Sequence, residues 1–163
     1  MAKKFTYFII LLILVSTVET SAKSNTAGLP IPRFVSIRSA EANLRVGPGH
    51  HFPAEWTYER ARMPVEIIAE FGDWRKVRDY EGTQGWFHRS LLSGRRHIIT
   101  LKDKLFLKKE GDKNARTIAS LQNGTVAELL KCKNAWCHIH IKSAPSVKGW
   151  VEKAHIWGVY ENE

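Results

Sequence analysis

The feature that most constrains this sequence is an internal repeat anchored on its tryptophans. Trp74 and Trp136 each follow a segment of one glutamate and two aliphatic residues, at an offset of 62 residues. Trp86 and Trp150 are each preceded by a glycine, at an offset of 64 residues. A repeat of roughly sixty residues is the size of a small barrel of about five short strands. The sequence therefore predicts one small barrel per copy.

The residues between these anchors support this fold class. From Phe34 onward, short runs of β-branched and aromatic residues alternate with Gly, Pro, Asn and Asp turns, and no long amphipathic helical stretch occurs. We predict an all-β chain with two small β-barrels in tandem. Residues 34–96 are expected to form the first barrel and residues 97–163 the second.

The N-terminal residues have the composition of a leader and a tether. Lys3 and Lys4 precede an apolar stretch at residues 5–15, and small and polar residues lead to Ala22. This order is typical of a secretory signal peptide, residues 1–22, because the apolar stretch is shorter than the roughly twenty residues of a spanning helix. Small, polar and proline residues make residues 23–33 a predicted linker. We expect a periplasmic or otherwise exported protein, with an uncleaved membrane tether as the alternative.

The chain is strongly basic, and this affects its choice of partners. Its formal net charge of +9 becomes +8 once Lys3, Lys4 and Glu19 leave with the signal peptide. A positive surface attracts anionic envelope polymers, lipid head groups or nucleic acid through a field that does not depend on sequence. Export argues against nucleic acid as the physiological partner, and solubility is the other explanation of the charge.

Two predicted hairpins determine which side chains share a face. If Gly72-Asp73 and Asn134-Ala135 are two-residue turns, residue i faces residue 145 − i in the first copy and 269 − i in the second. The expected apolar faces contain Ile68 and Val77 in one copy, and Leu130, Ile139 and Ile141 in the other. The opposite faces contain Trp74, Lys76 and Arg78 in the first copy, and Lys131, Trp136, His138 and His140 in the second.

The same register pairs the two cysteines. Cys132 falls opposite Cys137, and Glu70 falls opposite Arg75 at the matching place in the first copy. Export permits a disulfide, and the short loop suits a cross-strand bridge better than a metal site or a nucleophile. A surface ion pair contributes about 0–1 kcal/mol and a short-loop disulfide about 2 kcal/mol. We therefore expect the second barrel to depend more on its covalent bridge.

Three blocks of the first copy resemble the bacterial SH3-like (SH3b) domains, in the family's order and spacing. They are residues 42–49 (Ala-Asn-Leu-Arg-Val-Gly-Pro-Gly), 72–78 (Gly-Asp-Trp-Arg-Lys-Val-Arg) and 82–88 (Gly-Thr-Gln-Gly-Trp-Phe-His). The second copy departs from the pattern, because Leu105-Phe106-Leu107-Lys108-Lys109 stands where the first block would be.

The cysteine pair, Gly149-Trp150-Val151 and residues 156–160 are similar to a subgroup of exported tandem SH3-like proteins from alphaproteobacteria. The resemblance covers essentially the whole chain after the signal peptide. It implies two SH3-like barrels and an exported location, with no established ligand. Other members of the wider family bind cell-wall peptides or accompany cell-wall hydrolases.

The sequence offers no recognisable catalytic constellation. It lacks a nucleophile beside a base, and the cell-wall peptidases that accompany such barrels need a separate cysteine–histidine domain for which no length remains. His138 and His140 alternate on one strand without a third metal ligand nearby. His50 and His51 follow a turn and are expected in an exposed loop. We predict a non-enzymatic protein without a cofactor or a metal.

Six tryptophans make aromatic contacts the main candidates for binding. Trp86, Trp150 and Trp157 are assigned to core packing. Trp74 and Trp136 are predicted to line aromatic grooves, with Trp56 as a further candidate and Arg45, Lys76 and Arg78 as partners of a ligand carboxylate. The predicted ligand is a peptide, from the peptidoglycan stem or from an exported protein. The alternative is a basic electrostatic binder that uses residues 95–97 (Arg-Arg-His) with Lys102, Lys104, Lys108 and Lys109.

Overall fold

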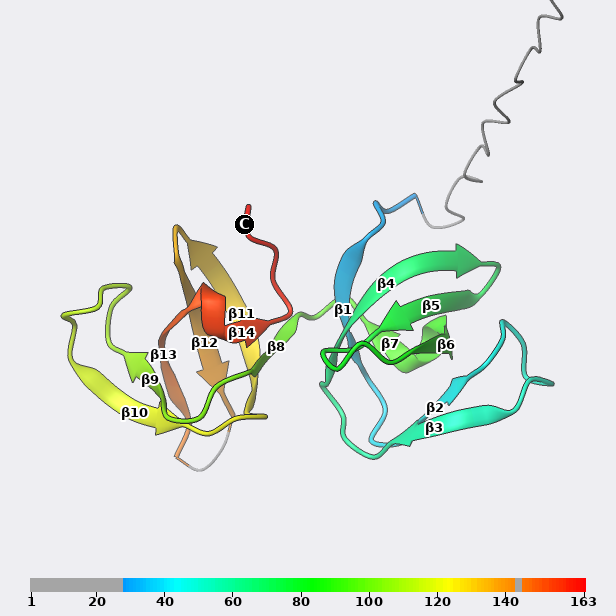
Figure 1. Ribbon diagram of the computed structural model, residues 1–163, viewed down its shortest axis with the longest axis horizontal. Helices are drawn as coiled ribbons and strands as arrows, with labels where there is room; N and C mark the ends of the chain where they lie inside the picture. Colours follow the sequence, from blue (N-terminus) through cyan, green and yellow to red (C-terminus); the bar gives the residue numbers. More distant parts are fainter. Residues whose placement is uncertain (1–27, 143–144) are drawn as a thin grey trace, which may run out of the picture.

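The computed structural model describes residues 28–142 and 145–163, and these residues confirm the all-β prediction (Figure 1). Within them the only helical turns are two short 3₁₀ helices, η1 (Arg89–Leu91) and η2 (Lys153–His155). The same residues contain no helix with the length and hydropathy to cross a membrane. The predicted signal peptide, its cleavage after Ala22, and residues 23–27 of the predicted linker lie outside the described residues.

Each copy of the repeat forms one seven-stranded antiparallel sheet that curves into a small barrel (Figure 1). The first barrel contains β1 (Arg33–Ile37), β2 (Ala42–Arg45), β3 (Ala54–Tyr58), β4 (Pro64–Phe71), β5 (Trp74–Arg78), β6 (Gln84–His88) and β7 (Leu92–Ser93). The second contains β8 (His97–Thr100), β9 (Leu105–Lys108), β10 (Thr117–Leu121), β11 (Val126–Lys133), β12 (Trp136–Ile141), β13 (Val147–Glu152) and β14 (Ile156–Trp157).

The two sheets have the same topology. Their strand orders are β3-β2-β6-β5-β4-β1-β7 and β10-β9-β13-β12-β11-β8-β14, so the strands correspond position by position. Strand β9 therefore occupies the place of β2, although residues 105–109 lack the sequence block found at residues 42–49. Both copies are SH3-like barrels, as predicted.

A glycine in each barrel lets two strands approach closely, and the tryptophan that follows it points to the outer face. A Cβ on Gly85 would lie 2.5 Å from Cγ of Leu44, and one on Gly149 would lie 2.6 Å from Cγ of Leu107. Both leucines are buried in the cores. Because neighbouring residues of a strand point to opposite faces, Trp86 and Trp150 lie on the outer side. Their assignment to the core was wrong, since both are half-buried and neither belongs to a core cluster.

The predicted hairpin register holds at the turns and then slips by one residue. Glu70 pairs with Arg75 and Cys132 pairs with Cys137, as predicted, but one extra residue bulges from each long strand. Beyond the bulge Ile67 pairs with Val77 and is buried, whereas Ile68, expected on the apolar face, is half-buried.

The second barrel shows the same correction. Leu129 pairs with Ile139 and packs against the core, whereas Leu130, predicted to point inward, is 42% exposed. At a bulge, two residues of one strand lie opposite a single residue of the partner strand. Beyond it, the residues of the bulged strand point to the opposite face from the one expected. It allows Leu129 and Cys132, three residues apart, to point into the same core.

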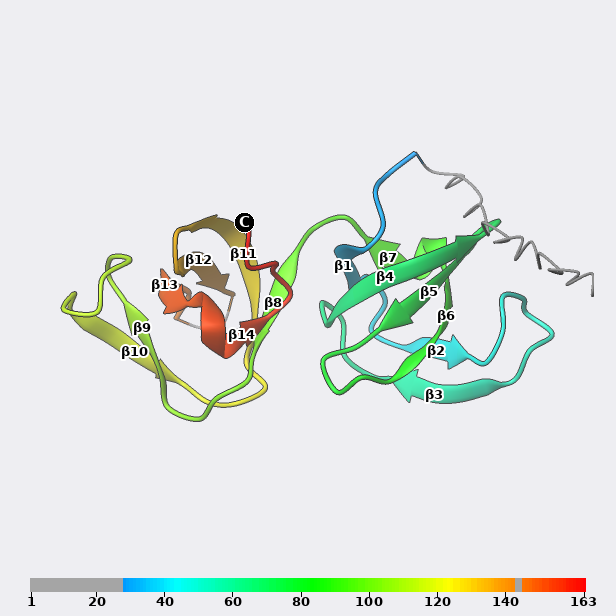
Figure 2. The same cartoon turned by 45° about the horizontal axis from the view of Figure 1, so that its top comes forward.

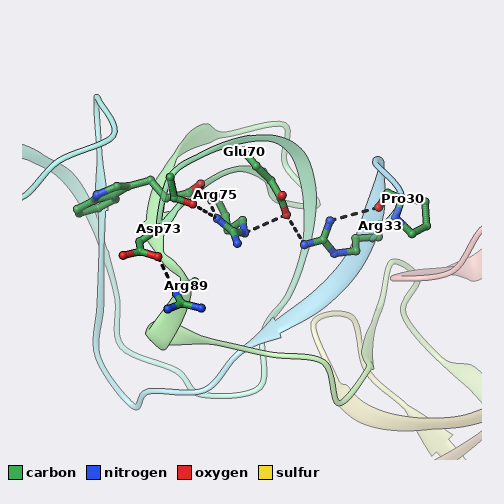
Figure 3. A network of polar contacts seen from close by, with 8 residues as sticks. Pro30, Arg33, Glu70, Asp73, Arg75 and Arg89 are labelled. Carbon is green, nitrogen blue, oxygen red and sulfur yellow. Dashed lines mark hydrogen bonds and ion pairs between the residues drawn. The ribbon is translucent and has the colours of Figure 1, made fainter. Parts of the chain in front are cut away.

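The matched pairs near the hairpin turns stabilise the two barrels in different ways. The predicted Cys132–Cys137 disulfide is present. In the first barrel Nε of Arg75 lies 2.9 Å from Oε1 of Glu70, and the same oxygen forms an ion pair with Arg33 (Figure 3). The prediction of a surface ion pair was wrong, because the Glu70 side chain is only 1% exposed and the Arg75 side chain is also buried. The first barrel therefore contains a buried cluster of one carboxylate and two guanidinium groups.

The two barrels pack against each other through β1 and through the residues that begin and end the second barrel. Both views place β1 and β8 on the facing sides of the barrels (Figure 2). The Phe34 ring contacts the rings of Trp157 and Tyr160, at centroid distances of 4.8 and 4.6 Å. The Tyr160 hydroxyl donates a hydrogen bond of 3.0 Å to Oε1 of Glu66. Trp157 thus joins the core of the first barrel, which agrees with its predicted packing role.

A buried histidine at this contact makes stability depend on pH. His97 is buried, and both its backbone N–H and its ring lie within hydrogen-bond distance of Oγ of Ser36. Burial lowers the pKa of His97 below its usual 6.5. A hydrogen bond to the Arg95 backbone and the charge of Glu128 oppose this effect, and Arg62 and Lys142 add to it. The neutral ring is therefore favoured in the folded protein. This contribution to stability is complete above pH 6.5 and decreases as the pH falls toward the folded-state pKa.

We accordingly expect the wild-type protein to lose more stability between pH 8 and pH 5 than a His97→Gln variant. Urea unfolding at a series of pH values, followed by tryptophan fluorescence, measures the difference. Parallel pH profiles for the two proteins would show that His97 has no such role.

Candidate functional site

The second barrel has a pocket at the predicted residue Trp136. The pocket has a volume of about 670 Å³. Trp136 is 9% exposed and is the aromatic residue of a lining completed by Lys113, Asn134, Ala135, Glu152, Lys153, Ala154, Ile156, Val159 and Glu161. A volume in this range and a mixed lining are typical of sites for small ligands and short peptides.

Four separate segments build this pocket. The turn at Asn134 and Ala135 places Trp136 at the start of β12, and Asn134 has a φ of 53°, a left-handed conformation that asparagine tolerates. Helix η2 supplies Lys153 and Ala154, and the backbone N–H of Lys153 donates to the Ala135 carbonyl at 2.8 Å. Glu152 at the end of β13 and Ile156 of β14 flank η2, and the β9–β10 hairpin and the C-terminal segment supply the remaining walls.

The charged groups of the pocket have both signs. Lys113 is exposed, whereas Nζ of Lys153 donates to the carbonyl of Glu161 at 3.1 Å and also to that of Glu163. Glu152 lies beside His155, with 3.2 Å between Oε2 and Nδ1. Because an aromatic surface lies next to cations and carboxylates, the pocket suits a short ligand that has an apolar part and charges of both signs.

Trp136 also borders a second, smaller pocket of about 270 Å³, which extends to Trp150. Gly111 of the β9–β10 hairpin packs over both rings. A Cβ at this position would lie 3.2 Å from Cβ of Trp136 and 3.3 Å from Cε3 of Trp150. The glycine thus permits the hairpin to approach both tryptophans, and the two pockets adjoin at Asn134 and Trp136.

The equivalent place in the first barrel is covered by histidines. Trp74 is also 9% exposed, and the rings of His50 and His88 lie 4.9 and 5.5 Å from its ring, edge to face. His50 comes from the loop that follows the Gly-Pro-Gly turn, where an exposed position was predicted, and it is exposed. Trp74 therefore lies on the predicted outer face, beneath two imidazoles.

The other predicted ligand contacts of the first barrel divide into two groups. Arg45 and Lys76 both pair with Trp86, from the two neighbouring strands, and thus flank it on the outer face. One guanidinium nitrogen of Arg45 donates to the Phe52 carbonyl at 2.6 Å. Arg78, by contrast, forms an ion pair of 2.5 Å with Glu66.

Trp56 lies apart from these residues, on the edge strand β3, and is 58% exposed. It borders a pocket of about 360 Å³ that also includes Tyr58, Tyr80 and Ile99.

Sequence reasoning missed Lys113, Glu152, Lys153 and Glu161 at the Trp136 pocket. Their nearness to Trp136 depends on how the hairpin and the C-terminal segment fold back, which no local pattern shows.

The histidines of β12 have other contacts in the structure. The His138 ring stacks on Trp150 at 5.0 Å, and His140 lies 2.7 Å from Oγ of Ser146 and 3.6 Å from Oε2 of Glu128. Burial lowers the pKa of His138, and the nearby Lys131 and Lys148 lower it further. In residues 28–142 and 145–163, no three His, Cys, Asp or Glu side chains gather in a way that could hold a metal ion.

Comparison with known proteins identifies the repeat. The model of the bacterial SH3 domain family matches the chain twice, at residues 38–94 and 102–158. No curated protein matches it. Among solved structures, NlpC2 from Trichomonas vaginalis is 11% identical with a TM-score of 0.34, and the match covers 78% of this chain and 44% of that one. The endolysin LysPBC5 CBD is 12% identical with a TM-score of 0.28, covering 76% of this chain and 90% of that one.

The chain thus spans less than half the length of NlpC2. The two matches to the family model together cover more than half of this chain, and each falls on one of the two barrels. The chain belongs to the bacterial SH3 domain family.

Proposed function

We propose that this protein is an exported, non-catalytic binding module of the cell envelope, and that the Trp136 pocket recognises a peptide. The observation that carries the proposal is the pocket itself, with its aromatic residue, lysines and glutamates. A stem peptide of peptidoglycan or a segment of an exported protein has the matching chemistry, because both combine apolar side chains with carboxylates and amines. The predicted signal sequence at residues 1–22 is the reason for placing the function in the envelope.

The pocket supports recognition and offers little for catalysis. Its cations, carboxylates and aromatic ring can bind the charged ends and apolar parts of a peptide by hydrogen bonds and packing. The only cysteines of the chain, Cys132 and Cys137, are bonded to each other. The family matches assign the repeat to a bacterial SH3 domain and identify no catalytic domain.

Filling the pocket tests the proposal directly. Ala154 is exposed on η2 and lines the pocket, so an Ala154→Trp substitution blocks the site without disturbing the core. We expect affinity for a soluble stem peptide, measured by calorimetry with the full chain, to fall by at least about tenfold, or about 1.4 kcal/mol. Retention on purified peptidoglycan should fall in parallel.

Two controls separate the pocket from the net charge. Ser90 has the middle position of η1, as Ala154 has in η2, so Ser90→Trp makes the same change in the first barrel and should leave affinity unchanged. Lys113→Glu should weaken binding, whereas Lys102→Glu, an exposed lysine outside the pocket lining, should not. Equal losses in both lysine variants, or no loss in Ala154→Trp, would refute the pocket as the peptide site.

A further inference from the structure

A row of side chains crosses four strands on the outer side of the second barrel. Lys131 of β11 pairs with His138 of β12, His138 pairs with Trp150 of β13, and Trp150 pairs with Lys108 of β9. Directly paired residues point to the same face of a sheet. Adjacent strands are about 4.8 Å apart, so the row extends for roughly 14 Å at right angles to the strands.

Trp150 organises this row. The His138 ring stacks on the indole with an interplanar angle of 20°, and Nζ of Lys131 lies 5.7 Å from the centre of the indole ring. A lysine within about 6 Å of an aromatic face is attracted by the ring quadrupole. Nζ of Lys108 donates to the carbonyl of Ala115 at 3.1 Å. The cations of the row are therefore held in place before any ligand arrives.

Two more lysines extend the row into a surface. Lys133 lies two residues beyond Lys131 on β11, and Lys148 lies two residues before Trp150 on β13. Residues two apart along a strand share a face, and Lys131, Lys133 and Lys148 are all exposed. We call the surface formed by Lys108, Lys131, Lys133, His138, Lys148 and Trp150 the basic face.

A second basic segment, residues 95–97, makes contacts with other residues of the chain. Arg96 donates to the Gly158 carbonyl and pairs with Glu163, Arg95 lies 3.6 Å from Glu128, and His97 is buried at the contact between the barrels. Residues 95–97, weighed above as an anion-binding segment, thus have partners within the chain. Lys102, Lys104 and Lys109, which were grouped with this segment, are exposed, whereas Lys131 and Lys108 of the basic face are held by an indole ring and a carbonyl. The ordered cations make the basic face the better candidate surface for an anion.

We propose that the basic face binds a linear polyanion that lacks aromatic bases, such as an anionic polysaccharide or a polyphosphate. Charge complementarity along a row of ordered cations favours a polymer with repeating carboxylates or phosphates. Proteins that bind single-stranded nucleic acid combine such cations with free aromatic rings on which bases stack. Here His138 and Lys131 lie over the indole of Trp150, so the ring is not free to stack on a base. The site therefore recognises the charges of a polymer and not nucleic-acid bases.

The first barrel has a weaker version of this surface. Ala69 takes the place of Lys131, Lys76 that of His138, Trp86 that of Trp150 and Arg45 that of Lys108. Lys131, whose ammonium group lies over the indole of Trp150 in the second barrel, is therefore replaced in the first barrel by the methyl group of Ala69. We infer that polyanion binding belongs mainly to the second barrel.

A pair of matched charge reversals tests the proposal. The probes are polygalacturonate, which has carboxylates, and polyphosphate, each measured by calorimetry against the full chain. We expect Lys131→Glu with Lys148→Glu to weaken binding of at least one polymer by tenfold or more, about 1.4 kcal/mol. It should also reduce the slope of log K against log salt by one to two units, since about 0.7 counterion is released per contact.

The control is Lys102→Glu with Lys104→Glu, which changes the net charge equally at exposed lysines of the β8–β9 loop. It should change affinity by less than threefold. Equal losses in both double variants would overturn the proposal in favour of net charge alone. Tighter binding of an oligo(dT) strand or of phosphatidylglycerol vesicles than of either polymer would also overturn it.

The two polymers distinguish a carboxylate ligand from a phosphate ligand. If the double variant loses affinity for only one of them, the charged group of that polymer is the one that the basic face binds. Ala154→Trp should leave polymer binding unchanged, since Ala154 lies outside the basic face. Failure of the peptide pocket and failure of the basic face are thus separate results.

Discussion

Replacing Glu70 with alanine is expected to destabilise the protein by about 3–5 kcal/mol. The carboxylate is buried and forms ion pairs with both Arg33 and Arg75, and its removal leaves two guanidinium groups near each other without their counterion. Removing one partner of a buried ion pair costs this much because the remaining charge stays desolvated. Urea unfolding followed by circular dichroism measures the change.

Two variants separate the charge from the packing. Glu70→Gln keeps the size of the side chain and should lose less than Glu70→Ala. The double substitution Glu70→Met with Arg75→Met should recover part of the loss, because a packed apolar pair avoids the desolvation of the charges. A loss below about 1 kcal/mol in Glu70→Ala would show that the cluster behaves like the exposed pair predicted from the sequence.

The matching change in the other barrel is Cys132→Ser with Cys137→Ser, which removes the disulfide. We expect it to lower the free energy of unfolding by about 2 kcal/mol, measured by the same urea unfolding.

Phe34→Ala is expected to cost about 3–5 kcal/mol and to separate the unfolding of the two barrels. Phe34 is buried on β1, where it contacts Trp157 and Tyr160, and the guanidinium carbon of Arg96 lies 5.8 Å from the centre of its ring. Truncation removes the aromatic contacts of Phe34 between the barrels and opens a cavity there, although Ile99 of β8 also packs against the core of the first barrel. We expect one calorimetric transition in the wild type and two in the variant.

The matched control is Phe106→Ala, which truncates the same side chain where it is 54% exposed. It should change stability by less than about 1 kcal/mol, because exposed substitutions usually have small effects. A single transition in Phe34→Ala, with the midpoint of the wild type, would mean that Phe34 does not hold the barrels together.

The parts of the fold that could be predicted from sequence are those determined by local signals. The turns at Gly72-Asp73 and Asn134-Ala135 fix the hairpin register at their own ends, and this was enough to pair Cys132 with Cys137. The repeat of glycine-tryptophan pairs gave the number of barrels. The bulges could not be foreseen, because both residues in Ile67-Ile68 and in Leu129-Leu130 are apolar and either could point inward.

The remaining errors concern contacts between residues far apart in the sequence. Arg33 was placed at the end of a linker, but it begins β1 and pairs with Glu70, which is 37 residues away. That contact turns an exposed pair into a buried cluster. Trp136 was singled out from its face alone, whereas the walls of its pocket come from segments whose positions only the tertiary fold determines.

The C-terminal segment has a consequence for the energetics of binding. Val159 and Glu161 line the Trp136 pocket, while Tyr160 between them bonds Glu66 and packs against Phe34 of the other barrel. A ligand that needs this pocket wall in place shifts the equilibrium toward the docked barrels, by a free energy that grows with its concentration relative to Kd. By thermodynamic reciprocity, docking raises the affinity for that ligand by the same factor. For the peptide ligand proposed above, the first barrel would therefore act as an effector of a site to which it contributes no lining residue.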